Sequence, residues 1–173
     1  MIRSSWNKAA RPLILTALVA SSIAVAACGG APMQSTPSSE QAKQLTVQAV
    51  HAAAANSFPP GYKLTEIVFP GESCTDSSDK ETGQVRVGVT YWVDGPDRAH
   101  NDSYYEKLKK WWNDNGWTIE TDTWTGEQFA NAHNNDGYLM SLTGTVTGTV
   151  LGRLSIGASS PCVWPNGTPE PRS

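Results

Sequence analysis

The chain lacks an excess of basic residues, and this absence narrows the range of its partners. Its 173 residues include 13 Lys and Arg against 16 Asp and Glu, which gives a formal net charge of −3 at pH 7. Domains that bind nucleic acid normally carry a basic patch that meets the phosphates. We therefore expect no nucleic-acid partner, and no polybasic segment that would hold the chain to anionic lipid.

Long hydrophobic runs are also scarce. One extended run, residues 13–27, is polar only at Thr16, Ser21 and Ser22, and its 15 residues fall short of the roughly 20 that a helix needs to span a bilayer. The first 11 residues hold three basic side chains and no acidic one. A basic start, a short apolar run and small residues at its end are typical of a secretory signal peptide.

The apolar run ends in Val25-Ala26-Ala27-Cys28, which resembles a bacterial lipobox. The resemblance implies cleavage after Ala27 and acyl chains such as palmitate on Cys28, which would anchor the chain to the outer face of the cell membrane. An uncleaved N-terminal anchor, or an ordinary signal peptide with an incidental cysteine, would fit the same residues.

Two further segments are similar to small cell-envelope lipoproteins of actinomycetes. Gly29-Gly30 and a Ser-, Thr- and Pro-rich stretch to Ser39 follow Cys28, and residues 160–165 read Ser-Pro-Cys-Val-Trp-Pro. The resemblance implies an extracytoplasmic location but no particular activity.

Cysteine is rare outside the lipobox, where only Cys74 and Cys162 remain. Because exported proteins reach an oxidising compartment, we expect these two residues to form a disulfide. Such a bridge closes a loop of about 90 residues and contributes roughly 4–5 kcal/mol in the chain-entropy model. Two free thiols or a metal site are the alternatives, although neither cysteine has a neighbouring His or Cys that would complete a zinc site.

We expect a cleaved signal peptide over residues 1–27, a flexible tether over 28–39, and a single domain over 40–173 with a Pro-rich C-terminal tail. Removal of residues 1–27 leaves ten basic residues against sixteen acidic ones, a net charge of −6. The tether is rich in Gly, Ser, Pro and Thr, which favours a flexible spacer between lipid and domain.

The spacing of apolar residues predicts two helices. The first covers residues 40–56 after a capping box at Ser38 and Gln41. We expect it to bury Ala42, Leu45, Ala49 and Ala52 or Ala53. The second follows a capping box at Ser103 and Glu106 and ends at Asn115-Gly116. Its apolar face is rich in aromatic residues, namely Tyr104, Tyr105, Leu108, Trp111 and Trp112.

Alternating β-formers predict strands over residues 62–69, 84–93, 117–125, 138–145 and 149–158, with a long loop over 70–83. The clearest is the second strand, in which one face carries Val85, Val87, Val89, Tyr91 and Val93. The order α-β-β-α-β-β-β favours an α+β fold, with a single antiparallel sheet of about five strands and two helices packed on one face.

Two tryptophans indicate a candidate ligand face. Trp92 and Trp124 each fall on the polar face of a predicted strand, beside Arg86, Glu120 and Asp122. Flat aromatic rings bordered by polar groups suit a sugar ring or a peptide. Alternatively, the C-terminal tail covers these rings, or they border the core.

We expect no catalytic set, no metal site and no cofactor. Glu120 and Asp122 could form the carboxylate pair of a glycosidase, although solvated acids on a strand are more common. His133 and Asp136 lack a serine or cysteine nucleophile in a suitable sequence context. A further cluster of possible metal ligands consists of Asp94, Asp97, His100 and Asp102. Its spacing departs from the calcium-loop pattern and fits roles in a turn and at a helix start instead.

These patterns favour a lipid-anchored extracytoplasmic envelope protein that is not an enzyme and binds a ligand or protein. The expected partners are the membrane, through lipid on Cys28, and an envelope protein or glycan. A cell-envelope hydrolase and a structural or accessory subunit of an envelope assembly are the alternatives.

Overall fold

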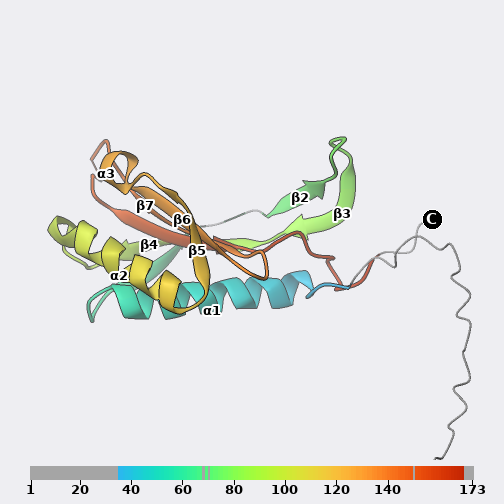
Figure 1. The fold of residues 1–173 in the computed structure, drawn as a ribbon, viewed down its shortest axis with the longest axis horizontal. Helices are drawn as coiled ribbons and strands as arrows, with labels where there is room; N and C mark the ends of the chain where they lie inside the picture. Colours follow the sequence, from blue (N-terminus) through green and yellow to red (C-terminus); the bar gives the residue numbers. More distant parts are fainter. Residues whose placement is uncertain (1–34, 68, 70, 150, 170–173) are drawn as a thin grey trace, which may run out of the picture. The chain divides into compact units, whose positions relative to one another are not determined.

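The computed structural model describes residues 35–169 with the exception of 68, 70 and 150. These residues belong to one compact unit, Met33–Ser173. The predicted signal peptide, its cleavage after Ala27 and the lipidation of Cys28 lie outside the described residues. Within the unit, two long helices cover one face of an antiparallel sheet (Figure 1).

The main sheet has six strands in the order β1-β4-β8-β7-β6-β5. Every neighbouring pair is antiparallel. The strands are β1 (Lys63–Ile67), β4 (Gly88–Asp94), β5 (Trp117–Asp122), β6 (Phe129–Asn134), β7 (Leu139–Gly144) and β8 (Leu154–Ser159). The predicted α+β class and antiparallel sheet are therefore confirmed, but the strand count and order differ, in part because no strand was predicted over β6.

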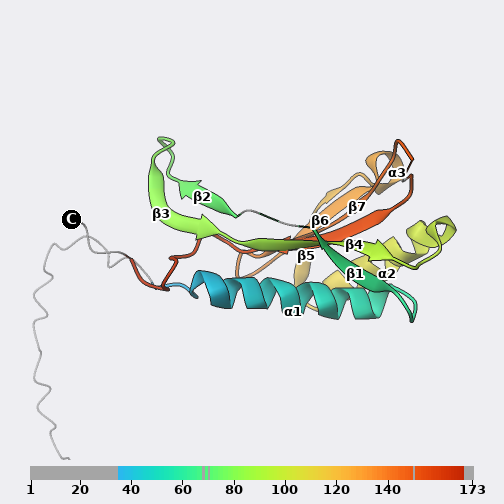
Figure 2. The ribbon, with the colours of Figure 1, turned by 180° about the vertical axis from the view of Figure 1, so that it is seen from behind.

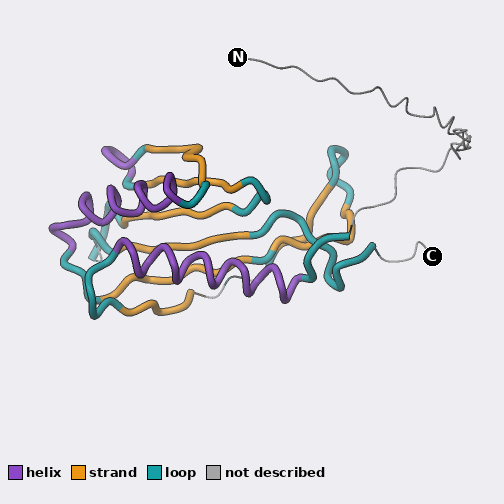
Figure 3. Tube along the Cα trace, turned by 60° about the horizontal axis from the view of Figure 1, so that its bottom comes forward, coloured by secondary structure: helices purple, strands orange, loops and turns teal. Residues whose placement is uncertain are grey.

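One face of this sheet forms the core with helices α1 (Ser39–Ser57) and α2 (Asn101–Asp114). The two helices lie side by side on this face (Figure 3). Alternate residues of β4 point into the core as predicted, since Val89, Tyr91 and Val93 are buried. Neighbouring strands and α2 contribute Ile156, Met140, Leu142, Ala130, Ala132, Tyr104, Tyr105, Leu108 and Trp112.

Helix α1 begins at the predicted capping box, in which Ser38 and Gln41 exchange side-chain and backbone hydrogen bonds. Its buried face is rotated from the predicted one, because Thr46 and Val50 are buried whereas Leu45 is 44% exposed. The Thr46 hydroxyl can be buried because it donates to the Lys43 carbonyl. Small side chains then allow α1 to lie close to β4 and β8.

Helix α2 begins earlier than the predicted capping box at Ser103 and Glu106. A short 3-10 turn, η1 (Arg98–His100), runs directly into α2, and Asp97 accepts a hydrogen bond from the Ala99 amide at its start. The carboxylate at Asp97 therefore takes the capping role, and Ser103 lies inside the helix.

A second, two-stranded sheet occupies most of the predicted loop 70–83. Strands β2 (Glu72–Thr75) and β3 (Glu81–Arg86) form a hairpin that rises from the main sheet on the side away from α1 (Figure 2). The predicted strand 84–93 is therefore divided at Val87 between β3 and β4. The hairpin was missed because it is mostly polar, and its turn is stabilised by two backbone amides that donate to Asp76.

The predicted disulfide is present between Cys74 of the hairpin and Cys162 of the C-terminal segment. Val85 and Val163 pair through two backbone hydrogen bonds of 2.9 Å next to it. The disulfide and this backbone pairing therefore fix the C-terminal segment to the hairpin.

The same C-terminal segment also holds the start of the described chain. The amide of Thr36 donates to the Gly167 carbonyl at 2.9 Å, and the amide of Trp164 donates to the Thr36 hydroxyl at 2.8 Å. Ser39 bonds to the Pro165 carbonyl. The flexible tether predicted over residues 28–39 is thus fixed to the domain from Thr36 onward.

Candidate functional site

The sheet face that the helices do not cover carries small polar residues. The strand register places Thr90 of β4, Gly157 of β8, Ser141 of β7 and Asn131 of β6 side by side. A Cβ added at Gly157 would lie 2.8 Å from Thr90 Oγ1 and 2.9 Å from the Val89 carbonyl oxygen. Close packing therefore requires glycine at this position. Because glycine has no side chain, the middle of this face forms a low region between the side chains around it.

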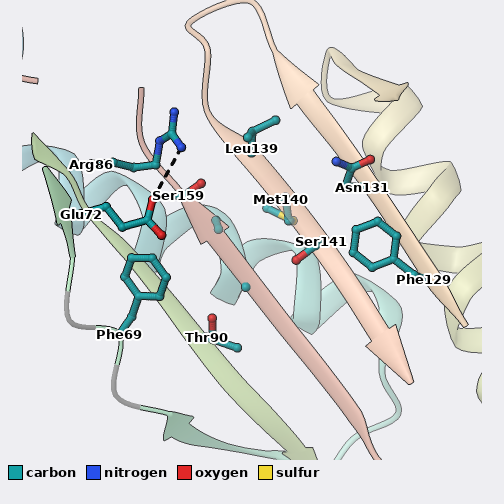
Figure 4. Close-up of a pocket in the computed structure, with 12 residues that line it drawn as sticks. Phe69, Glu72, Arg86, Thr90, Phe129, Asn131, Leu139, Met140, Ser141 and Ser159 are labelled. Carbon is teal, nitrogen blue, oxygen red and sulfur yellow. Dashed lines mark ion pairs between the residues drawn. The ribbon is translucent and has the colours of Figure 1, made fainter. Parts of the chain in front are cut away.

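This low region forms the floor of a cavity of about 310 Å³, here called the sheet-face groove. Figure 4 shows its side chains, with Phe129 and Asn131 on one side and Phe69, Glu72 and Arg86 on the other. The residues that line it include Phe69, Glu72, Arg86, Thr90, Phe129, Asn131, Leu139, Ser141, Gly157 and Ser159.

The β2–β3 hairpin supplies the charged wall of the groove. Arg86 ends β3 and Glu72 begins β2, and their side chains form an ion pair at 3.7 Å (Figure 4). The disulfide at Cys74 and the backbone pairing of Val85 with Val163 hold this hairpin in place. The long-range covalent link thus positions one wall of the groove.

Two buried polar atoms of the lining have no hydrogen-bond partner among the described residues. They are Arg86 Nε and Asn131 Oδ1. The amide nitrogen of Asn131, in contrast, donates to Glu120 Oε2 at 3.2 Å, which fixes the orientation of the amide. Buried polar groups without a partner lose their hydration without compensation, so each of these two atoms destabilises the packing of the lining.

The two tryptophans of the predicted ligand face do not share a face. Trp124 lies in a short helix, α3 (Trp124–Glu127), rather than in a strand, and only 6% of it is exposed. Its ring stacks on Tyr105 with a centroid separation of 4.5 Å, and its Nε1 donates to Asp102 at 2.9 Å. Strand β5 ends at Asp122, so the alternation that placed Trp124 outward does not extend to it.

Trp92 lies on the uncovered sheet face, as predicted, but beside the groove rather than in it. The guanidinium of Arg153 lies 4.4 Å from the centroid of the indole and donates to Asp94 at 2.9 Å. Hydrogen bonds from Thr65 and Arg153 also lower the pKa of Asp94. The chain's own Arg153 therefore covers this ring, whereas the alternative we considered placed the C-terminal tail over it.

Glu120 and Asp122 were predicted to share a strand face, and an irregularity of β5 between Ile119 and Thr121 separates them. Glu120 bonds to Asn131, whereas Asp122 accepts a hydrogen bond from Lys109 of α2 at 3.1 Å. An extra residue in one strand of an antiparallel pair reverses the alternation beyond it. The two carboxylates therefore do not form the pair that a glycosidase needs.

Asp122 belongs to a second polar hollow between α2, α3 and β5. The pKa of its carboxyl group is lowered by the nearby Tyr105 hydroxyl, by the Lys109 ammonium and by the Trp124 amide. Desolvation and the same carboxylate raise the pKa of Tyr105, and the carboxylate raises that of Lys109. The ionised Asp122, the neutral Tyr105 and the charged Lys109 therefore stabilise one another. Because Tyr105 and Lys109 belong to α2 and Asp122 belongs to β5, the cluster joins these two elements.

The remaining candidates do not form a centre. His133 lies on β6 opposite Thr118 and Leu139, and Asp136 lies in the exposed β6–β7 turn. Asp97 begins η1, and Asp102 holds the Trp124 indole. Within the described part of the chain, no three His, Cys, Asp or Glu side chains are grouped so that they could hold a metal ion.

Sequence reasoning found Arg86 but missed most of the groove. Phe69, Phe129, Asn131 and Ser141 carry no motif, and they meet only through the pairing of β6, β7, β8 and β4. The one available signal was the run of small residues on the outward positions of the last strands. That pattern indicates a sheet face that no helix covers, but it does not indicate which residues border the face to form a groove.

Searches of protein-family models, curated proteins and solved structures gave no significant match to this chain. Among the helices formed by the described residues, none combines the length and the hydrophobicity needed to cross a membrane.

Proposed function

We propose that the chain is a lipid-anchored extracytoplasmic protein that binds a ligand in the sheet-face groove. The observation that carries this proposal is a cavity of about 310 Å³ whose lining combines an ion pair, hydroxyl groups and two phenylalanine rings. Its size lies at the lower end of the range of small-molecule sites. The groove therefore fits a small ligand, or a short segment of a larger one.

The membrane anchor in this proposal rests on the sequence. The apolar run before Cys28 and the small residues at its end support export and lipidation. The disulfide between Cys74 and Cys162 is consistent with an oxidising compartment outside the cytoplasm.

The proposal treats the domain as a binding protein rather than an enzyme. Asp122, one of the two carboxylates of the candidate glycosidase pair, is bonded to Lys109 and has a lowered pKa. A general acid near neutral pH needs a raised carboxyl pKa instead. Hydrolysis of a cell-wall or ester substrate that is lost in Asp122→Asn or His133→Ala would contradict this part of the proposal.

Photo-crosslinking in cells tests the groove directly. A benzophenone amino acid replaces Leu139, which lines the groove, in the full-length protein. The matched control carries the same group at Lys107, an exposed position of α2 on the other side of the sheet. We expect a defined mass adduct at position 139 that is absent at position 107.

The same crosslinking is repeated with Ser141→Leu, which places a larger side chain on the groove floor. We expect this change to suppress the adduct at position 139. Equal labelling at both positions, or no adduct at position 139, would contradict ligand binding in the groove.

A further inference from the structure

The chemistry of the sheet-face groove narrows the class of ligand that it fits. Resting on the binding function proposed above, we propose that the groove binds an uncharged saccharide of two or three rings. The inference depends on the charge balance, the hydrogen-bonding groups and the aromatic rings of the lining.

The charges of the lining cancel. Glu72 and Arg86 are the charged side chains among the described lining residues, and they pair with each other at 3.7 Å. A phosphate or carboxylate ligand is favoured by cations that are not already neutralised. The pair instead offers acceptors and donors side by side, which matches a sugar hydroxyl because that group both donates and accepts.

The floor continues this mixture of donors and acceptors. Thr90, Ser141 and Ser159 present hydroxyl groups, and the amide side chain of Asn131 lies beside them in the lining. An acyl chain would cover these groups without bonding to them, which is unfavourable. A ring with several hydroxyls can bond to them at once.

Two phenylalanines complete the lining. Figure 4 shows Phe129 beside Ser141 on one side of the groove and Phe69 near Arg86 and Glu72 on the other. Aromatic rings pack against the C–H faces of sugars. Strands β4 and β6 are three strand spacings apart, about 14 Å, so a ligand that reaches both sides needs more than one ring.

A peptide fits this floor less well. Strands β7 and β8 lie inside the sheet and pair with neighbours on both sides, so their backbone groups are already used. Extended peptides gain much of their binding energy from main-chain pairing with a free strand edge. The floor of the groove offers no such edge.

Calorimetric titration of the purified full-length protein tests the saccharide class. The probes are the neutral trisaccharides cellotriose, maltotriose, mannotriose and triacetylchitotriose, with laurate, trialanine and galacturonate as representatives of the other classes. We expect saturable binding of at least one neutral trisaccharide. Ser141→Leu should weaken it at least about tenfold, because the larger side chain fills the floor.

Ser155→Leu is the matched control, because Ser155 lies two residues from Gly157 along β8 on the same face, outside the groove, and pairs with residues that do not line it. It should bind like the wild type, and melting curves of both variants should match that of the wild type. Binding of laurate, trialanine or galacturonate in place of the trisaccharides, with the same sensitivity to Ser141→Leu, overturns the saccharide class but not the binding function. Failure of all four trisaccharides to bind also overturns the saccharide class. The crosslinking at position 139 tests the binding function separately.

Discussion

At the scale of single residues, Trp124 shows how a side chain that looked available for binding is used for packing. It stacks on Tyr105 of α2, bonds to Asp102 and is almost fully buried. This one ring therefore connects α3 to the start of α2.

Trp124→Ala should destabilise the domain by about 3–5 kcal/mol, as expected for removal of a buried aromatic side chain. Urea denaturation followed by circular dichroism measures the change. Trp92→Ala should have a smaller effect, because Trp92 is only partly buried. An unchanged denaturation midpoint for Trp124→Ala would show that the stacked arrangement contributes little.

Asp122 and Lys109 give the domain a defined pH dependence. The pKa of Asp122 is lowered from its ordinary value of 3.8, so its contribution to stability is full above that value and is lost as the pH falls through the lowered pKa. The pKa of Lys109 is raised from 10.5, so its contribution is full below that value and is lost as the pH rises through the raised pKa.

The melting temperatures of the wild type and of Asp122→Asn should therefore differ most at pH values between the lowered pKa of Asp122 and the raised pKa of Lys109. They should converge in strong acid. Both side chains are 34% exposed, so the difference will be modest and will shrink at high salt. Asp114→Asn serves as a control on an exposed pair with Lys110. A gap between wild type and Asp122→Asn that persists unchanged in strong acid would argue against this ion pair.

At the scale of secondary-structure elements, the β2–β3 hairpin depends on contacts distant in the sequence. It pairs with the rest of the described chain through the disulfide and through Val85 and Val163. A two-stranded hairpin is marginally stable in isolation, so these links are expected to determine its order.

Replacement of both Cys74 and Cys162 by alanine should lower the stability by up to about 4–5 kcal/mol, because the unfolded chain regains the freedom of a long loop. Hydrogen exchange should accelerate at the amides of Val85 and Val163. The amide of Ile156 in the middle of β8 is the internal control and should change only as far as the global stability does. Unchanged exchange at Val85 would show that the hairpin is held without the bridge.

Elements with strong periodicity could be predicted from the sequence, and elements held by neighbours could not. The aromatic face of α2 and the valines of β4 gave correct positions because their spacing matches the structure. Strand β6 has weak strand-forming residues such as Ala130, Asn131 and Ala132. It forms because β5 and β7 pair with it on both sides, while its alanines fit the core.

The groove was beyond prediction for the same reason. Arg86 and Asn131 are 45 residues apart in the numbering and face one cavity only because β8 pairs between β4 and β7. Local patterns give the direction of side chains along one strand, but not which strands become neighbours. The irregularity in β5 similarly reversed the predicted direction of Asp122.

At the scale of the whole molecule, the proposed anchor can be tested apart from the domain. Cys28→Ala should remove the site of lipidation, so the protein should move from the membrane fraction to a soluble one. Labelling with a palmitate analogue should be lost in the same variant. Cells that express the wild type give the reference, and retention of Cys28→Ala in membranes would indicate an uncleaved N-terminal segment instead.

The hydrogen-bonded junction between residues 36–39 and 164–167 has a mechanical consequence. Tension applied to the chain ahead of Thr36 meets this junction before it meets the first turn of α1. Through Trp164 and the neighbouring Cys162, the load passes to the cross-linked hairpin. These bonds must therefore break before the tension reaches the first turn of α1, so the junction shields the helix from small loads.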